Sequence, residues 1–247
     1  MPLLALLAAV AAAQPAAAAA PAAPFALVEL FTSEGCSSCP PADRLLGRIA
    51  AEAARSGQNV LALAFHVGYW DYLGWTDRLA RPEFGRRQRR YAAALSDGVY
   101  TPQLVVNGAA AFVGSDESRV RAAIAAALAR PAAASLAADA VLHGQAQRVD
   151  VRVAGSGLPD GATVEVAVVE DGLSTRVLRG ENADSVLRHS RVVRALGALP
   201  AGAAAGEVTL DVPPDLVGER SSVVVFAQDR VTGRVLAAAG VPLRRSP

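Results

Sequence analysis

The sequence predicts an α/β domain followed by a small all-β domain that resembles a sandwich. In the first half of the chain, strand-like and helix-like segments alternate, which is typical of a sheet with crossover helices. In the second half the helical periodicity mostly disappears, and short apolar runs are separated by turn residues. We therefore expect domains at 25–130 and 135–245, after a segment 1–23 of a different kind.

The segment 1–23 is interpreted as a signal peptide followed by a linker rich in Ala and Pro. Leu3 to Ala13 is an unbroken apolar run, too short for the roughly 20 residues of a membrane helix, and small residues follow it. A periplasmic or secreted location is the expectation. The alternative is an Ala/Pro tail on a cytosolic protein, because no Lys or Arg precedes the run. A second apolar run of membrane-spanning length is absent from the sequence, so no membrane span is expected.

The composition is that of a folded, nearly neutral protein. The 247 residues are 52% hydrophobic and contain 24 Lys+Arg against 23 Asp+Glu, a formal net charge of +1. This balance gives no electrostatic basis for bulk binding to nucleic acid or to a charged membrane surface. The sequence also contains no Gly-rich phosphate loop, no GxSxG elbow and no metal-type pair of CxxC motifs.

In the first half, apolar runs predict strands, and apolar side chains that recur on one face predict helices. Asn107-Gly108 favours the type I′ turn of a hairpin, and Ser115 can cap a helix. The expected order is a strand at 26–31, a helix at 42–55, a strand at 60–65, a helix at 83–95, hairpin strands at 104–106 and 110–113, and a helix after Ser115.

In the second half, alternating short runs predict strands that a sandwich can contain. Gly- and Pro-containing turns separate them. The expected strands are 149–153, 164–169, 208–212, 223–228 and 235–239.

The only two cysteines, Cys36 and Cys39, lie directly after a predicted strand and directly before a predicted helix. Pro40 and Pro41 lack backbone donors, so the helix can contain them only in its first turn and must begin at the cysteines. A helix N-terminus favours a thiolate and lowers the thiol pKa below about 8.5. Cys36 is therefore the expected nucleophile and Cys39 the resolving thiol. A purely structural disulfide remains the alternative.

The order of these elements resembles the thioredoxin fold, with 99–108 similar to its cis-proline segment and hairpin. The runs 31–43, 65–71 and 100–103 more closely resemble a family of secreted bacterial thioredoxin-like proteins catalogued as a domain of unknown function; 180–182 and 192–194 resemble it too. The resemblance implies that Thr101 and Pro102 form a cis-proline loop that offers backbone hydrogen bonds to a substrate peptide. It implies a fold but no activity.

The chain departs from ordinary thioredoxins at the acid that these proteins keep six residues before the first cysteine, where Leu30 stands. Glu29 is one residue away, and neighbouring strand residues point to opposite faces. Glu29 can accept a proton from Cys39 only if a bulge shifts the register. Otherwise it is a carboxylate at the rim.

Two further candidates lie near the expected site. His66 ends the second parallel strand, so we expect it on the same sheet edge as Cys36. It can assist proton transfer, complete a Cu(I) site with Cys36 and Cys39, or only hydrogen-bond a loop. Trp70 belongs to an aromatic loop, which predicts either a substrate-binding lip or packing between domains.

The sequence thus predicts an exported thiol–disulfide oxidoreductase-like protein with Cys36 and Cys39 as the catalytic pair and no cofactor or metal. The expected partner is a protein that carries a thiol or disulfide, or a small thiol. The alternatives are a Cu(I)-binding metallochaperone-like protein and a redox-inert binding module. The arginine run 86–90 is interpreted as a solvated helix face, and His143 and His189 as surface residues.

Overall fold

The computed structural model describes residues 22–246. Their helices are α1 (Pro40–Ser56), α2 (Pro82–Leu95) and α3 (Glu117–Leu128), with the short 3-10 helices η1 (Asp71–Leu73) and η2 (Gly218–Arg220). Their strands are β1 (Ala26–Thr32), β2 (Val60–His66), β3 (Gln103–Val106), β4 (Ala110–Val113), β5 (Ser135–His143), β6 (Arg148–Ser156), β7 (Ala162–Glu170), β8 (Leu173–Arg176), β9 (Val186–His189), β10 (Val192–Ala198), β11 (Ala205–Asp211), β12 (Ser221–Asp229), β13 (Val235–Pro242) and β14 (Arg244–Arg245).

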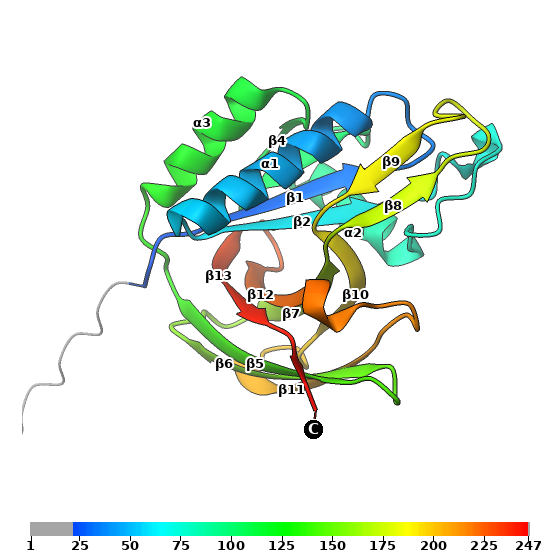
Figure 1. The fold of residues 1–247 in the computed structure, drawn as a ribbon. Helices are drawn as coiled ribbons and strands as arrows, with labels where there is room; N and C mark the ends of the chain where they lie inside the picture. Colours follow the sequence, from blue (N-terminus) through cyan, green and yellow to red (C-terminus); the bar gives the residue numbers. More distant parts are fainter. Residues whose placement is uncertain (1–21, 247) are drawn as a thin grey trace, which may run out of the picture.

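One eight-stranded mixed sheet contains strands from both halves of the chain, in the order β13-β12-β7-β10-β2-β1-β3-β4 (Figure 1). The halves join where β10 pairs in parallel with β2, at Val192 and Ala64. There the Ala64 amide donates to the carbonyl oxygen of Arg191 over 2.7 Å. A four-stranded sheet, β11-β6-β5-β14, and the β8–β9 hairpin complete the strand pairing.

The predicted fold class is therefore wrong. The structure is mostly β, and its large sheet does not divide into a thioredoxin-like α/β unit and a separate β-sandwich. The reason is visible in β7, which is buried on both faces: Val164, Val166 and Val168 pack toward the second sheet, while Ala167 and Val169 pack on the opposite side. A hydrophobic run predicts such a strand but does not specify its neighbours.

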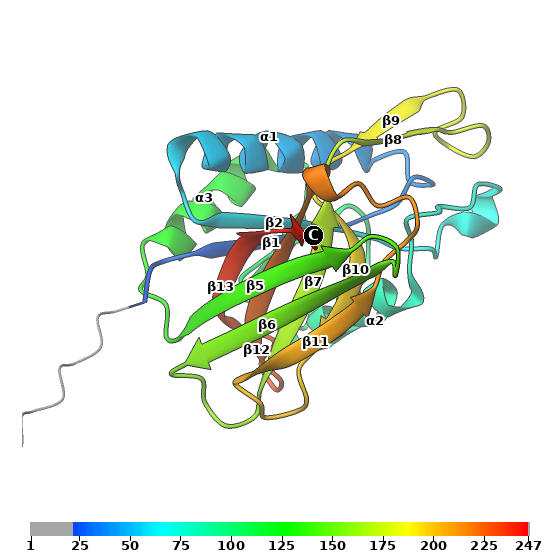
Figure 2. The same ribbon diagram turned by 60° about the horizontal axis from the view of Figure 1, so that its bottom comes forward.

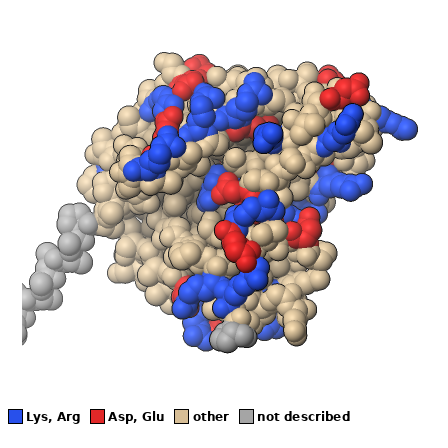
Figure 3. Space-filling view, in the orientation of Figure 1, with Lys and Arg blue, Asp and Glu red and all other residues tan. Residues whose placement is uncertain are grey.

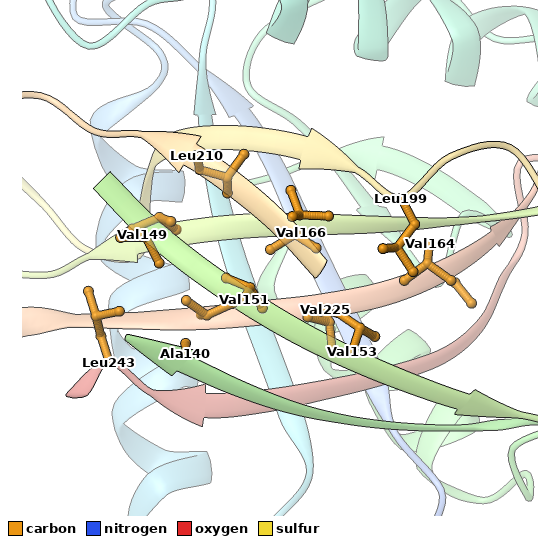
Figure 4. Close-up of a cluster of buried hydrophobic side chains, with 14 of the residues drawn as sticks. Ala140, Val149, Val151, Val153, Val164, Val166, Leu199, Leu210, Val225 and Leu243 are labelled. Carbon is orange, nitrogen blue, oxygen red and sulfur yellow. The ribbon is translucent and has the colours of Figure 1, made fainter. Parts of the chain in front are cut away.

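The large sheet is covered differently on its two faces (Figures 1 and 2). One face packs on α2 through Phe84 and Tyr91. On the other face, α1 and α3 cover the part made of β1 and β3, while the four-stranded sheet covers the part made of β7 and β12. Figure 4 shows this inter-sheet core, in which Val149, Val151 and Leu210 face Val166 and Val225.

Several local predictions are confirmed, with small shifts. Helix α1 begins at Pro40 with Cys39 as its N-cap, as the two prolines require. Asn107 and Gly108 have φ of 48° and 60°, which fits the predicted hairpin turn. The cap of α3 is Asp116 and not Ser115, because the Asp116 carboxylate accepts from the backbone amide of Arg119. The strands β5, β8, β9, β10 and β14 were not among the predicted elements.

The predicted signal peptide lies outside the described residues, apart from the end of its linker. Within 22–246, no helix has the length and apolar character needed to cross a membrane.

Candidate functional site

The two cysteines lie between the carboxyl end of β1 and the first turn of α1. Both thiols are free and buried, with exposed fractions of 1% for Cys36 and 0% for Cys39. The Cys39 amide donates to the carbonyl oxygen of Cys36 over 3.2 Å, and the Cys36 amide donates to that of Ser33 over 3.2 Å. These bonds form a tight turn that brings the second cysteine back toward the first.

The two thiols have opposite acidity. A hydrogen bond from Cys39 is the main reason that the pKa of Cys36 falls to about 6, and the hydroxyls of Ser38 and Thr101 add to this against the opposing effect of burial. Burial raises the pKa of Cys39, and its hydrogen bond to Cys36 and the Cys36 charge raise it further. The pKa of Cys36 is therefore lowered, as predicted, and neighbouring hydrogen-bond donors contribute to this.

The loops at 70 and 101 meet beside Cys36. The Thr101–Pro102 peptide bond is cis, as the resemblance implied. The Trp70 indole Nε1 donates to the Thr101 hydroxyl over 2.7 Å. Trp70 also lies against Gly35, where an added Cβ would come within 3.0 Å of the Trp70 Cβ. Thr101 and Trp70 therefore form one wall of the site, and Pro102 follows Thr101 directly across the cis bond.

A second wall comes from the loop of the β8–β9 hairpin, far along the chain. The buried Asn182 amide Nδ2 donates to the carbonyl oxygens of Glu34 and Cys36, each over 2.9 Å. The exposed Glu181 carboxylate accepts from the Ser37 amide over 3.0 Å. Sequence reasoning noted 180–182 only as part of a family resemblance, because nothing local connects this loop to the cysteines.

His66 ends β2, as predicted, and is buried at this edge of the sheet. Its Nδ1 lies 2.7 Å from the Asp77 carboxylate. Burial disfavours the charged imidazole, but Asp77 outweighs it with help from Asp43 and Glu34, so the pKa of His66 is raised. Its Nε2 is buried without a hydrogen-bond partner.

His189 is buried, so its assignment to the surface is wrong. Its Nε2 lies 3.1 Å from Glu34 Oε1, and Glu34 Oε2 accepts from the Trp75 indole over 2.8 Å. The rings of His66 and His189 meet edge to face, with centroids 4.8 Å apart. Both histidines therefore belong to one buried polar cluster behind the cysteines, which no local sequence pattern indicates.

Asp43, also missed by sequence reasoning, lies one helical turn after Cys39. Burial raises the pKa of the Asp43 carboxyl, and the nearby imidazoles of His66 and His189 only partly offset this. The spacing of four residues along a helix was the available signal, since it places Asp43 and Cys39 on the same face.

The alternative metal site finds no support in the geometry. Across residues 22–246, no group of three or more His, Cys, Asp and Glu side chains is arranged to hold a metal ion. Cys36, Cys39 and His66 are therefore not brought together as a Cu(I) ligand set, although the histidine lies at the same sheet edge.

Glu29 faces away from the cysteines, because β1 keeps a regular register without a bulge. Its carboxylate accepts from Arg87 Nε over 2.7 Å and from the Tyr91 hydroxyl. Arg87 also donates to Glu165 over 2.7 Å and is only 1% exposed, so the predicted solvated arginine face is wrong at this position. The other arginines of the run are exposed: Arg86, Arg89 and Arg90.

The surface charge is mixed. Figure 3 shows basic and acidic side chains interspersed over one face of the molecule. Exposed ion pairs are also present, since Arg48 lies 2.8 Å from Glu117, and Arg121 lies 2.8 Å from Glu52. On this face there is no extended field of one sign of the kind that nucleic-acid binding requires.

Residues 27–228 match the family described as "Protein of unknown function (DUF1223)". The chain belongs to this family. Membership of DUF1223 confirms the predicted resemblance to a domain of unknown function, while the family description assigns no activity. No curated protein matches the chain.

Two solved structures are similar to this DUF1223 chain. A crystal structure of a protein from Agrobacterium tumefaciens has a TM-score of 0.62 and 28% identity, covering 90% of this chain and 96% of the other. HBP35 of Porphyromonas gingivalis has a TM-score of 0.62 and 12% identity, covering 90% of this chain and 76% of the other. At that identity the second likeness concerns the fold alone.

Proposed function

We propose that this DUF1223 protein carries out thiol–disulfide exchange, with Cys36 as the attacking thiol and Cys39 as the resolving thiol. The observation that carries the proposal is the opposite acidity of the pair: the pKa of Cys36 falls to about 6, while burial raises that of Cys39. At neutral pH the first sulfur is then a thiolate, which is the reactive nucleophile in exchange. The Cys39 thiol stays protonated at this pH until the resolving step.

The reaction follows from these charges. The Cys36 thiolate attacks one sulfur of a substrate disulfide, forms a mixed disulfide and releases the other substrate sulfur as a thiolate. Cys39 then loses its proton and attacks the Cys36 sulfur, which closes the Cys36–Cys39 disulfide and releases the second substrate thiolate. The substrate gains two electrons and the cysteine pair loses two; the reverse sequence oxidises a substrate dithiol.

The partner is a protein that carries a thiol or disulfide, or a small thiol. Thr101, Pro102 and Trp70 are the substrate contacts in this proposal, because Thr101 and Trp70 lie beside Cys36, Pro102 is joined to Thr101 by the cis bond, and Thr101 is partly exposed. Cys36 itself is 1% exposed, so a substrate sulfur reaches it only when a covering segment moves.

Export to the periplasm or to the medium is part of the proposal and rests on the apolar run from Leu3 to Ala13. An exported chain works where disulfides persist. Fractionation of cells that produce the full chain tests it. Recovery of an uncleaved chain in the cytosol would refute export, but it would not contradict the proposed thiol–disulfide exchange.

The exchange proposal is tested by the reduction potential of the Cys36/Cys39 pair, measured by equilibration with graded thiol buffers. A value between about −120 and −270 mV is expected, the range of catalytic dithiols, and a value well below about −300 mV would instead indicate a structural bridge. Two variants add a chemical test. Cys39→Ser should accumulate a mixed disulfide with a substrate disulfide, and Cys36→Ser should form none.

A further inference from the structure

A buried polar cluster behind Cys39 contains side-chain atoms that lack hydrogen-bond partners. Within residues 22–246, four buried side-chain polar atoms have none, and three of them are in this cluster: Thr32 Oγ1, His66 Nε2 and His189 Nδ1. Buried polar atoms without partners cost free energy, so their concentration at one place calls for a chemical reason.

Asp43 lies close enough to Thr32, His66 and His189 for these side chains to affect its pKa. It is four residues after Cys39 on α1, so the two side chains share one helix face, and its amide donates to the Cys39 carbonyl over 3.1 Å. The Thr32 hydroxyl on β1 is close enough to both to favour the ionised forms of Cys39 and Asp43. Thr32 and Cys39 are fully buried, and Asp43 is half-buried.

Each of the two imidazoles contacts a carboxylate through one ring nitrogen. His66 contacts Asp77 through Nδ1, and His189 contacts Glu34 through Nε2, so each ring keeps its other nitrogen free. Both imidazoles favour the ionised form of Asp43. A carboxylate bonded to one ring nitrogen fixes the orientation of the ring.

We propose that Asp43 accepts the proton of Cys39 in the resolving step, and that His66 and His189 are positioning residues that stabilise the Asp43 carboxylate. This inference rests on the proposed exchange function. The Cys39 proton passes to Asp43, the Cys39 thiolate attacks the Cys36 sulfur of the mixed disulfide, and the substrate thiolate leaves. Asp43 then returns its proton to solvent or to the departing thiolate.

The acidity of Asp43 is consistent with this role. Its pKa is raised above that of an ordinary aspartate, mainly by burial, so it exchanges its proton closer to neutral pH. The groups that interact with the Asp43 carboxyl come from several elements: Cys39 at the start of α1, Thr32 on β1, His66 on β2, His189 on β9, and Asp77 after η1.

The experiment follows both steps with the aromatic disulfide dithiobis(nitrobenzoate), whose thiolate product is coloured. The reduced chain should release one thiolate when Cys36 attacks and a second when Cys39 resolves the mixed disulfide. Asp43→Asn should slow the second release at least about tenfold and leave the first nearly unchanged, because only the resolving step needs the base. Glu52→Gln, on the same helix and far from the thiols, is the matched control and should change neither release.

The pH dependence separates a proton acceptor from a structural role. In the natural chain the second release should rise with Asp43 ionisation and then level off, whereas in Asp43→Asn it should keep rising with hydroxide concentration. Added formate should restore part of the second release in Asp43→Ala. An unchanged second release, equal slowing of both releases, or an Asn variant with the natural pH profile would overturn the inference.

The two proposals fail in different ways. A variant that does not fold would expose both thiols to the reagent, so a cooperative urea unfolding transition is confirmed for each variant before its releases are compared. If the natural chain gives no first release, the exchange function itself is wrong. If it gives both releases and Asp43→Asn does too at the natural rates, only the role of Asp43 is wrong.

Discussion

The side-chain amide of Asn182 donates a hydrogen bond to the carbonyl oxygen of Cys36, 146 positions earlier in the chain, over 2.9 Å. The same nitrogen donates to the carbonyl oxygen of Glu34. The β8–β9 hairpin therefore holds the backbone of the CxxC turn directly, at the point where Cys36 is 1% exposed. We therefore expect the hairpin to limit access to the Cys36 thiol.

Replacement of Asn182 by Ala should make Cys36 more reactive toward iodoacetamide. Two buried hydrogen bonds of about 0.5–1.5 kcal/mol each are lost, so we expect alkylation to become roughly fivefold faster or more at a fixed pH. Peptide mapping by mass spectrometry measures the rate at Cys36. Arg188→Ala, an exposed change on β9 of the same hairpin, is the control and should leave the rate as it was. An unchanged rate in Asn182→Ala would show that another segment limits access.

Alkylation of Cys36 in the reduced chain should titrate at unusually low pH. Only the thiolate reacts, and the pKa of Cys36 is about 6, so the rate should rise through that pH and level off above it. A free thiol would instead give half its maximal rate near about pH 8.5. Since the pKa of Cys39 is raised, Cys39 should stay unmodified over the same range. A midpoint near that of free cysteine would contradict the proposed nucleophile.

Thr101→Val should move that midpoint to higher pH. The Thr101 hydroxyl accepts from Trp70 Nε1, which leaves its own hydrogen available to stabilise the Cys36 thiolate. Hydrogen bonds to charged groups are worth about 1.5–3 kcal/mol, so an upward shift of about one pH unit or more is expected. Thr101→Ser keeps the hydroxyl and should preserve the midpoint. Equal midpoints in the Val and Ser variants would show that the Thr101 hydroxyl does not lower the pKa of Cys36.

Arg87→Met should strongly destabilise the fold. The Arg87 guanidinium pairs with Glu29 on β1 and Glu165 on β7, and its removal leaves these carboxylates without their partner. The free energy of unfolding, measured with urea, should fall by about 3–5 kcal/mol. Arg90→Met, an exposed neighbour 3.7 Å from Glu165, should cost less than about 1 kcal/mol. Similar losses in the two variants would mean that the buried pairs add little.

Local chemistry explains which predictions succeeded. Pro40 and Pro41 fit only a first helical turn, so the start of α1 at the cysteines followed from covalent geometry. Asn107-Gly108 favours positive φ at both positions, and the hairpin turn followed from that. His66 was placed at a strand end by a short apolar run, and the strand does end there.

The incorrect predictions concern residues whose surroundings are distant in sequence. Glu29 and Arg87 are separated by 58 positions, and their pairing turns an expected exposed arginine into a buried one. His189 has no local feature that distinguishes it from a surface histidine, but β9 places it against Glu34. Each of these side chains contacts a strand, helix or loop that is distant in sequence, and the local sequence pattern does not identify that partner.

By itself the sequence determined that the cysteine pair lies at the start of a helix, and it determined most strand and helix positions, because dihedral preferences and hydrophobic periodicity act over a few residues. Only the tertiary structure decided that β10 joins β2 and merges both halves into one sheet. It also decided that His66 and His189 lie next to each other and close to Asp43, which follows Cys39 on α1. Strand pairing and buried charge are long-range properties, since their free energy depends on which distant segments exclude water together.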